Sequence, residues 1–426
     1  MYAIAALVLF LCVMLLSVPV AFSLGFGALL PGWLGASTSP SQVIRSIVTA
    51  LDSFPLLAVP LFILAGEIMT KGGLARRLFA FADALLGRFH GGLAMSSVAA
   101  CMMFGAISGS SPATVAAIGS MAIPLLVTKG YGLRFATSLV TAAGTLGVIV
   151  PPSIPMIIYG MAASTSVSAL FIGGILPALT IGSLLMLYAH VYGRRHRATI
   201  ATDAGRVSIG TAFRQSFWAL IAPVMVLGGI YAGVFTPTEA AAMAVVYGTF
   251  VSMVIFREMS IRQFFETLVS TALVIAPILI IAGTGAALGR VLTLLQVPAQ
   301  IGLFIGGAID ERLTLLLLIN AILLIVGMFM ETLSAIIVLT PILLPVLAPY
   351  GVDPVHFGLI MVVNLAIGFV TPPVGVNIYV ASGITNLSVV EICKGLLVPL
   401  SLLLFGLLAV TYIPALTLWL PSLGNQ

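Results

Sequence analysis

Charged side chains are scarce in this sequence, and their scarcity excludes a water-soluble fold. Only 7% of the 426 residues are Asp, Glu, Lys or Arg, while 61% are hydrophobic; a soluble domain carries about 25% charged residues. No charged residue occurs in 1–44, 89–128, 135–193 or 395–426. Because a helix needs about 20 apolar residues to cross the hydrocarbon core, the sequence predicts an all-α, multi-pass membrane protein with roughly ten to twelve membrane segments.

Cysteines and catalytic motifs are equally sparse. The three cysteines lie far apart in apolar settings, so they indicate neither a disulfide framework nor a metal site. The four histidines show no ligand spacing, and the sequence contains no Walker A loop, no GxSxG element and no HExxH motif. The chain has no visible means of hydrolysing ATP or cleaving a bond. We therefore expect neither an enzyme nor an organic cofactor.

The cations that are present gather in a few loops. One group lies within 71–88 and a second within 193–215, and together they contribute to a net charge of +5. The positive-inside rule places both groups in the cytoplasm, so we interpret the charge as a signal of orientation and not of nucleic-acid binding. Residues 1–22 lack the basic start of a signal peptide and predict the first membrane helix.

The stretch 193–215 is the longest and most charged polar segment. We predict a cytoplasmic connector there, either a short surface helix or a loop, between a first half at 1–192 and a second half at 216–426. Beyond it, the sequence Thr236-Pro-Thr-Glu239 has the pattern of a capping box, with Thr236 as the cap and Glu239 reaching back. Its role is therefore predicted to be structural.

Each half contains two breaks in its apolar runs. In the first half these are Ser108–Pro112 and Gly144–Ser153, and in the second half they are Gly327–Thr332 and Gly368–Gly375. The later break of each half contains a double proline. Backbone N–H and C=O groups cannot stay unpaired in hydrocarbon, so such breaks persist only where they are buried in protein or line a wet cavity. Backbone carbonyls that lose their hydrogen-bond donor at a proline can hold a cation, and the N-terminus of the helix that follows the break attracts anions.

The spacing of the breaks is the same in both halves. Pro151 follows Ser110 by 41 residues, and Pro372 follows Glu331 by 41 residues. Paired breaks at corresponding positions are typical of an inverted-repeat transporter. The pattern predicts two helical hairpins, at about 92–128 and about 313–348, and two broken helices, at about 135–165 and about 355–386.

Polar side chains at these breaks are candidates for substrate contact. Glu331 lies in a strongly apolar stretch, where an ionisable group is a functional hypothesis by default. It can instead be neutral, or folded against the backbone of the hairpin tip. Ser110, Thr332 and Asn377 are uncharged polar residues near the breaks, and we predict that they contribute to substrate binding with Glu331.

Five segments resemble the large membrane subunit of TRAP (tripartite ATP-independent periplasmic) transporters: Ser108–Pro124, Gly144–Gly160, Gly233–Gly248, Gly327–Pro345 and Gly368–Ile384. The likeness covers nearly the whole chain, in order. It implies an elevator mechanism, in which a transport domain slides against a scaffold, and it implies sodium coupling. It also implies two partners, a small four-helix membrane subunit and a periplasmic substrate-binding protein.

The resemblance further implies two sodium sites, built mostly from backbone oxygens that suit a hard cation. In this sequence, the resemblance implies that the first site consists of Ser108 and Ser111 with the carbonyls of Gly147, Val150 and Pro152. The second carries over to Gly327, Gly368, Thr371 and Val374.

The resulting expectation is a permease subunit in the bacterial inner membrane, importing a small organic anion such as a C4-dicarboxylate or a sialic acid with sodium. The sequence begins directly at its first membrane helix, so we expect a separate polypeptide to supply the small subunit. A stand-alone sodium/dicarboxylate carrier is an alternative. An ion channel would build its pore from rings of carbonyls or charged side chains. A membrane-embedded enzyme would need positioned ionisable groups, and Glu331 has no evident intramembrane partner.

Overall fold

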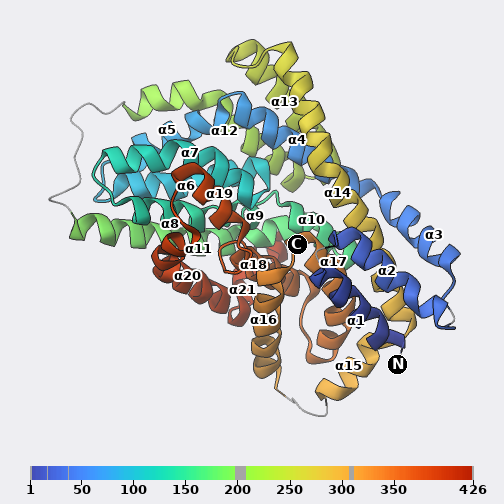
Figure 1. Cartoon of the computed structure of the whole chain (residues 1–426). Helices are drawn as coiled ribbons and strands as arrows, with labels where there is room; N and C mark the ends of the chain where they lie inside the picture. The colour runs from blue at the N-terminus through green and yellow to red at the C-terminus, as the bar shows by residue number, and fades with distance from the viewer. Residues whose placement is uncertain (1, 17, 37, 197–207, 307–310, 425–426) are drawn as a thin grey trace.

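The computed structural model describes residues 2–16, 18–36, 38–196, 208–306 and 311–424. Within these ranges all regular secondary structure is helical, as predicted (Figure 1). Nine of the described helices are long and apolar enough to cross a membrane, or ten if one bent pair counts as a span. Nine is below the predicted ten to twelve spans and ten is its lower limit, because several other apolar helices are only 10–17 residues long. Apolar stretches that look continuous in the sequence are divided by breaks into these shorter helices.

Five helices precede the first hairpin: α1 (Tyr2–Leu15), α2 (Val20–Trp33), α3 (Pro40–Leu51), α4 (Ala58–Lys71) and α5 (Leu74–Leu86). Helices α1 and α2 pack against each other, and α3 packs on the long helix α14 (Ile261–Leu294). A capping box starts α3, because the Ser39 hydroxyl accepts from the Gln42 N–H while the Gln42 side chain accepts from the Ser39 N–H.

The first hairpin consists of α6 (Gly92–Ser108) and α7 (Ser111–Thr128). Gly109 ends α6 in the left-handed conformation, with φ of 59°, which glycine adopts without a steric penalty. Ser110 then caps α7 by accepting from the Ala113 N–H at 3.5 Å. A two-residue turn is thus enough to reverse the chain.

The first broken helix is divided into α8 (Leu133–Ala143), α9 (Leu146–Ile149) and α10 (Ile154–Ala162). The axis bends by 42° at the double proline. Ser153 caps α10, and its hydroxyl also donates to the Val148 carbonyl at 2.5 Å. The Ser153 side chain therefore forms hydrogen bonds with backbone groups on both sides of the break, and these two groups need no water as a partner.

The middle of the chain contains α11 (Val167–Arg195), α12 (Ile209–Tyr231), α13 (Pro237–Phe250), a π-helical turn (Val251–Ile255) and α14. Within the predicted connector at 193–215, α11 continues to Arg195 and a Ser208 cap starts α12. The rest of it, 197–207, lies outside the described residues. The predicted capping box at Thr236–Glu239 is confirmed, with reciprocal hydrogen bonds at the start of α13.

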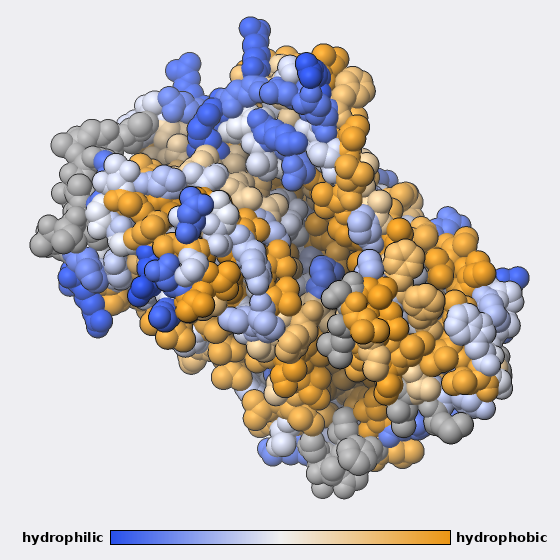
Figure 2. Space-filling view, viewed as in Figure 1, coloured by the Kyte–Doolittle hydropathy of each residue, from blue (hydrophilic) through white to orange (hydrophobic). Residues whose placement is uncertain are grey.

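The second half continues with α15 (Val297–Gly306), the hairpin helices α16 (Arg312–Phe329) and α17 (Thr332–Leu347), the broken pair α18 (Pro354–Gly368) and α19 (Val376–Thr385), and the last helices α20 (Val389–Tyr412) and α21 (Ala415–Gly424). From His356 to Gly368 every residue of α18 is buried. Helix α18 thus lies in the interior, while α14 exposes Phe265, Leu273 and Leu294 along an apolar outer face (Figure 2).

Two segments that are distant in the sequence meet at one end of the molecule. Arg76 and Arg77, at the start of α5, pair with Glu258 at 2.7 and 2.8 Å. Arg77 also lies over the ring of Phe256, 3.5 Å from its centre. Figure 2 shows hydrophilic side chains gathered at this end, where α14 begins. We call this end, defined by Arg76, Arg77 and Arg262, the basic face.

Candidate substrate cavity and cation sites

The two hairpin tips, more than 200 residues apart in the sequence, line a single cavity of about 450 Å³. The first tip contributes Ser108–Ala113 and the second contributes Glu331–Leu333. The remaining walls come from α4, α9, α10, α14 and α19, and from Phe369 just after α18. We call this space the hairpin-tip cavity. It brings together three of the four predicted substrate residues, namely Ser110, Glu331 and Thr332.

Oxygen atoms cluster at the first hairpin tip. The Ser108 hydroxyl, 2% exposed, lies 3.3 Å from the Thr114 hydroxyl, which donates to the Ser110 carbonyl at 2.8 Å. Gly147 of α9 faces the same group, since a Cβ there would collide with the Thr114 hydroxyl and the Ser110 carbonyl. Thr114 was not predicted from the sequence, although its place one turn after the break was a usable signal.

The same tip packs directly on the first proline break. The Ile154 N–H donates to the Gly109 carbonyl at 3.4 Å, and a Cβ on Gly109 would lie 3.0 Å from the Pro152 carbonyl oxygen. Pro152 is buried and Val150 is half-buried, where α9 ends. The structure therefore gathers the predicted first-site residues around the contact between hairpin and break.

Asn377 of α19 connects the second half to this tip. Its side-chain N–H₂ donates to the Ser111 hydroxyl at 2.8 Å and to the Thr141 carbonyl at 3.3 Å. The residue is fully buried, and its Oδ1 has no hydrogen-bond partner among the described residues. Asn377 lies behind Ser111 and is not among the residues that line the hairpin-tip cavity. Its geometry suits positioning of the tip more than direct contact with a substrate.

Glu331 caps the second hairpin helix. Its carboxylate accepts from the N–H groups of Leu333 and Ser334 at 2.9 and 3.1 Å, and from the Ser334 hydroxyl at 3.4 Å. The residue is folded against the tip backbone and at the same time borders the cavity. Glu67 of α4 also borders the cavity, and its partner Lys71 lies 3.9 Å away on the same helix. No Lys or Arg is among the described lining residues.

The second predicted cation site also assembles from hairpin and break. Gly327 and Gly368 are in contact, and a Cβ on Gly368 would collide with the Gly327 carbonyl oxygen. The Val374 N–H donates to the Met328 carbonyl at 3.3 Å, and the Thr371 hydroxyl donates to the Ile367 carbonyl of α18 at 2.7 Å. Val374 is 42% exposed, whereas the first break is buried. The two sites therefore share their construction and differ in exposure.

A buried amide pair behind the second site was not predicted. The Asn364 amide of α18 donates to the side chain and backbone carbonyls of Asn320 on α16, at 2.7 and 3.0 Å. The Asn320 amide donates to the Thr411 hydroxyl at 3.0 Å. These bonds fix α16 against α18, and hence Gly327 against Gly368. Single asparagines in otherwise apolar helices could have indicated such a contact, since these residues form hydrogen bonds between helices in membranes.

Comparisons with known proteins agree on one family. The family described as "Tripartite ATP-independent periplasmic transporter, DctM component" matches residues 7–416. The isethionate TRAP transporter permease protein DctMQ of Oleidesulfovibrio alaskensis is 45% identical over 95% of this chain, which spans only 64% of that protein's length. The C4-dicarboxylate TRAP transporter large permease protein DctM of Pseudomonas aeruginosa is 41% identical over 94% of both chains. The sialic acid permease SiaT of Haemophilus influenzae is 32% identical over 98% of this chain and 68% of its own.

Two solved structures share the fold. The YdaH transporter of Alcanivorax borkumensis superposes with a TM-score of 0.64 at 15% identity, over 95% of this chain and 97% of its own. MtrF of Neisseria gonorrhoeae, from a class of antimetabolite efflux pumps, gives a TM-score of 0.61 at 14% identity, over 87% and 83%. At these identities the likeness concerns the fold alone. By its sequence, the chain belongs to the DctM family, the large permease component of tripartite TRAP transporters of the bacterial inner membrane.

Proposed function

We propose that this chain is the permease of a sodium-coupled importer that takes a small organic anion from a periplasmic binding protein. The relatives carry names that specify isethionate, C4-dicarboxylates and sialic acid, all of which are organic anions. The tripartite family description supports two further components. We assign these roles to a small four-helix membrane subunit and the binding protein.

The observation that carries this proposal is the charge of the hairpin-tip cavity. Its described lining contains Glu67 and Glu331, and it contains neither Lys nor Arg. An organic anion brought next to these two carboxyl groups is repelled when they are ionised, and the repulsion is stronger than in water because the surroundings are less polar. Bound cations would remove this repulsion. The electrostatics of the cavity therefore support the proposed sodium coupling, in addition to family membership.

The residues present fit sodium at both predicted sites. Hydroxyl and carbonyl oxygens converge at Ser108, Ser110 and Thr114, and oxygen donors are the ligands that hard cations prefer. At the second site the contact of Gly327 with Gly368 places a hairpin carbonyl at the break. We propose that Ser108, Ser111, Gly147, Val150 and Pro152 form the first site, and that Gly327, Gly368, Thr371 and Val374 form the second.

We further propose that the hairpins and broken helices move as one unit against α3, α4 and α14. The buried contacts of Asn377 with Ser111 and of Asn364 with Asn320 support this, since they tie both hairpins to the broken helices. The matched spacing of the breaks supports an inverted repeat. In this arrangement, occupied cation sites would fix both tips around the substrate.

Uptake into proteoliposomes tests the proposal. The permease is reconstituted with its small subunit, and uptake of labelled isethionate and succinate is measured with and without a sodium gradient and the binding protein. The proposal expects uptake that needs both. Uptake that needs sodium alone supports the stand-alone carrier. Flux that needs neither refutes coupled transport and favours a channel.

A further inference from the structure

Three neighbouring cavities follow α14 away from the basic face. The hairpin-tip cavity touches Val274 and Ile278, the next cavity, of about 450 Å³, touches Ala282 and Ala286, and a third, of about 560 Å³, touches Ala286 and Arg290. These positions are four residues apart, so they lie on one face of the helix. The second and third cavities share residues and are therefore adjoining.

The other walls show the same progression. From the hairpin-tip cavity to the next, the lining advances by one helical turn on α10, from Ile154 to Ile158, and on α17, from Leu333 to Ile337. Thr49 of α3 then lines both the second and the third cavity. The three spaces thus follow one another along α14. The first two lie between α14 and residues of α10 and α17, and the third lies between α3 and α14.

The far end of this series lies at the outer face. Arg290 follows Arg262 by 28 residues on a single unbroken helix, which corresponds to about 42 Å, or the full thickness of a bilayer with its headgroups. Arg262 belongs to the basic face, which the positive-inside rule assigns to the cytoplasm. Arg290 and the groove around it therefore face the periplasm.

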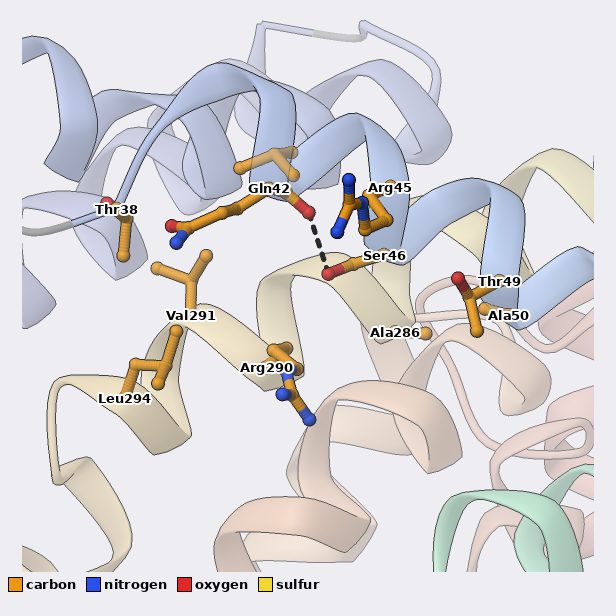
Figure 3. Close-up of a pocket in the computed structure, with 11 residues that line it drawn as sticks. Thr38, Gln42, Arg45, Ser46, Thr49, Ala50, Ala286, Arg290, Val291 and Leu294 are labelled. Atoms are coloured by element: carbon orange, nitrogen blue, oxygen red, sulfur yellow. Dashed lines mark hydrogen bonds between the residues drawn. The ribbon is translucent and has the colours of Figure 1, made fainter.

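The groove at this end has an unusual charge. Figure 3 shows Gln42 and Thr49 on the side of α3 that faces α14, with the Ser46 hydroxyl donating to the Gln42 carbonyl at 2.9 Å; Arg290 lies on α14, and its side chain extends away from α3 in this view. Arg45 completes the lining, and no acidic residue is among the described lining residues. Neither arginine forms an ion pair in the part of the chain that the structure describes. Two cations on the outer side run against the distribution that orientation alone favours.

We propose that Arg45 and Arg290 form a capture site for the transported organic anion, a carboxylate or sulfonate, at the outer end of this series of cavities. The inference rests on the function proposed above. Guanidinium groups bind carboxylate and sulfonate oxygens through forked hydrogen bonds, and a basic mouth raises the local anion concentration. The arginines provide the attraction that the acidic hairpin-tip cavity lacks.

The rate of thiol modification by charged reagents reports the electrostatic potential in these cavities, and it does so without requiring transport. Cys12, Cys101 and Cys393 are replaced by alanine, and Ala286→Cys is introduced where the second and third cavities adjoin. The complex with the small subunit, in right-side-out vesicles, is treated with an anionic sulfonate reagent (MTSES) or a cationic one (MTSET). Arg45→Gln combined with Arg290→Gln should lower the rate ratio MTSES/MTSET about tenfold at low ionic strength. High salt should shrink the difference.

The control is Arg312→Gln. Arg312 lies on the same outer face, because α15 with ten residues is too short to cross back, and it does not line the groove. It should leave the ratio within about twofold of the parent value. An unchanged ratio in the double variant, or an equal fall with Arg312→Gln, overturns the proposal.

Two further results separate the possible occupants. If an anionic phospholipid filled the groove, replacing phosphatidylcholine by phosphatidylglycerol would lower the parent ratio to that of the double variant, which also overturns the proposal. Where uptake of succinate or isethionate is measurable, the double variant should raise KM about tenfold and leave kcat unchanged. Failure of uptake in the parent protein would refute the proposed function, while the thiol ratio would still report on the groove.

Discussion

The contact between Gly368 and Gly327 leads to a sharp prediction about the second cation site. In Gly368→Ala the new Cβ would meet the Gly327 carbonyl oxygen, which belongs to backbone and not to a side chain that can turn away. The hairpin helix α16 must then move away from α18. Because these two glycines are the proposed cation contacts, the displacement should act on sodium binding before it unfolds the protein.

The magnitude follows from the cost of overpacking. Inserting a methyl group into a close-packed contact costs about 1–3 kcal/mol. If the cost falls on the cation-bound arrangement, sodium affinity drops about 5- to 150-fold, since about 1.4 kcal/mol corresponds to a factor of ten. The sodium concentration for half-maximal uptake should rise by at least the lower of these factors.

Gly383→Ala is the matched control. It lies on α19, beyond the same break, and a Cβ there meets no atom within 4 Å. Sodium activation of uptake is measured in proteoliposomes for the parent and both variants, with choline replacing sodium. Half-saturation unchanged in Gly368→Ala, or raised equally in both variants, would refute the role of the glycine contact.

Three further predictions concern the tips and their supports. Ser108→Ala and Ser111→Ala should each raise the sodium requirement of uptake, since each removes a hydroxyl near the first break; unchanged sodium activation in both counts against that site. Glu331→Gln keeps a carbonyl oxygen for the N-cap bonds, so it should cost less than about 1 kcal/mol of stability and yet impair transport; full activity would return Glu331 to a structural role. Asn364→Leu should lower thermal stability by about 1–3 kcal/mol. Adding Asn320→Leu should cost less than the sum of the two changes, and strict additivity in a thermal denaturation series would argue against the amide pair.

Much of the secondary structure could be predicted from the sequence, because prolines, glycines and capping residues act locally. The capping box at Thr236 and the all-helical character were predicted correctly. The end of α11 at Arg195, inside the connector at 193–215, has no sharp stop signal in a run of arginines. Helix ends in charged sequence depend on solvent and on neighbours more than on propensity.

Contacts between distant segments could not be predicted in the same way. The spacing of the breaks predicted corresponding hairpins, but the shared cavity of Ser110 and Glu331 is a property of tertiary packing. Asn377 was expected near substrate, and the structure places it behind Ser111. Thr114 and the Asn320–Asn364 pair were missed because a lone polar residue in an apolar helix does not reveal its partner. The site residues themselves stay a prediction until ligand binding is measured.

Thermal unfolding of the purified permease with its small subunit tests the central claim, that cations must neutralise the hairpin-tip cavity before an anion binds. The melting temperature is measured in sodium chloride and in choline chloride of equal concentration, with and without succinate or isethionate. A ligand that binds the native state raises this temperature. We predict that sodium stabilises the protein, and that an anion adds stabilisation only when sodium is present. Equal stabilisation by the anion in choline chloride would contradict the claim.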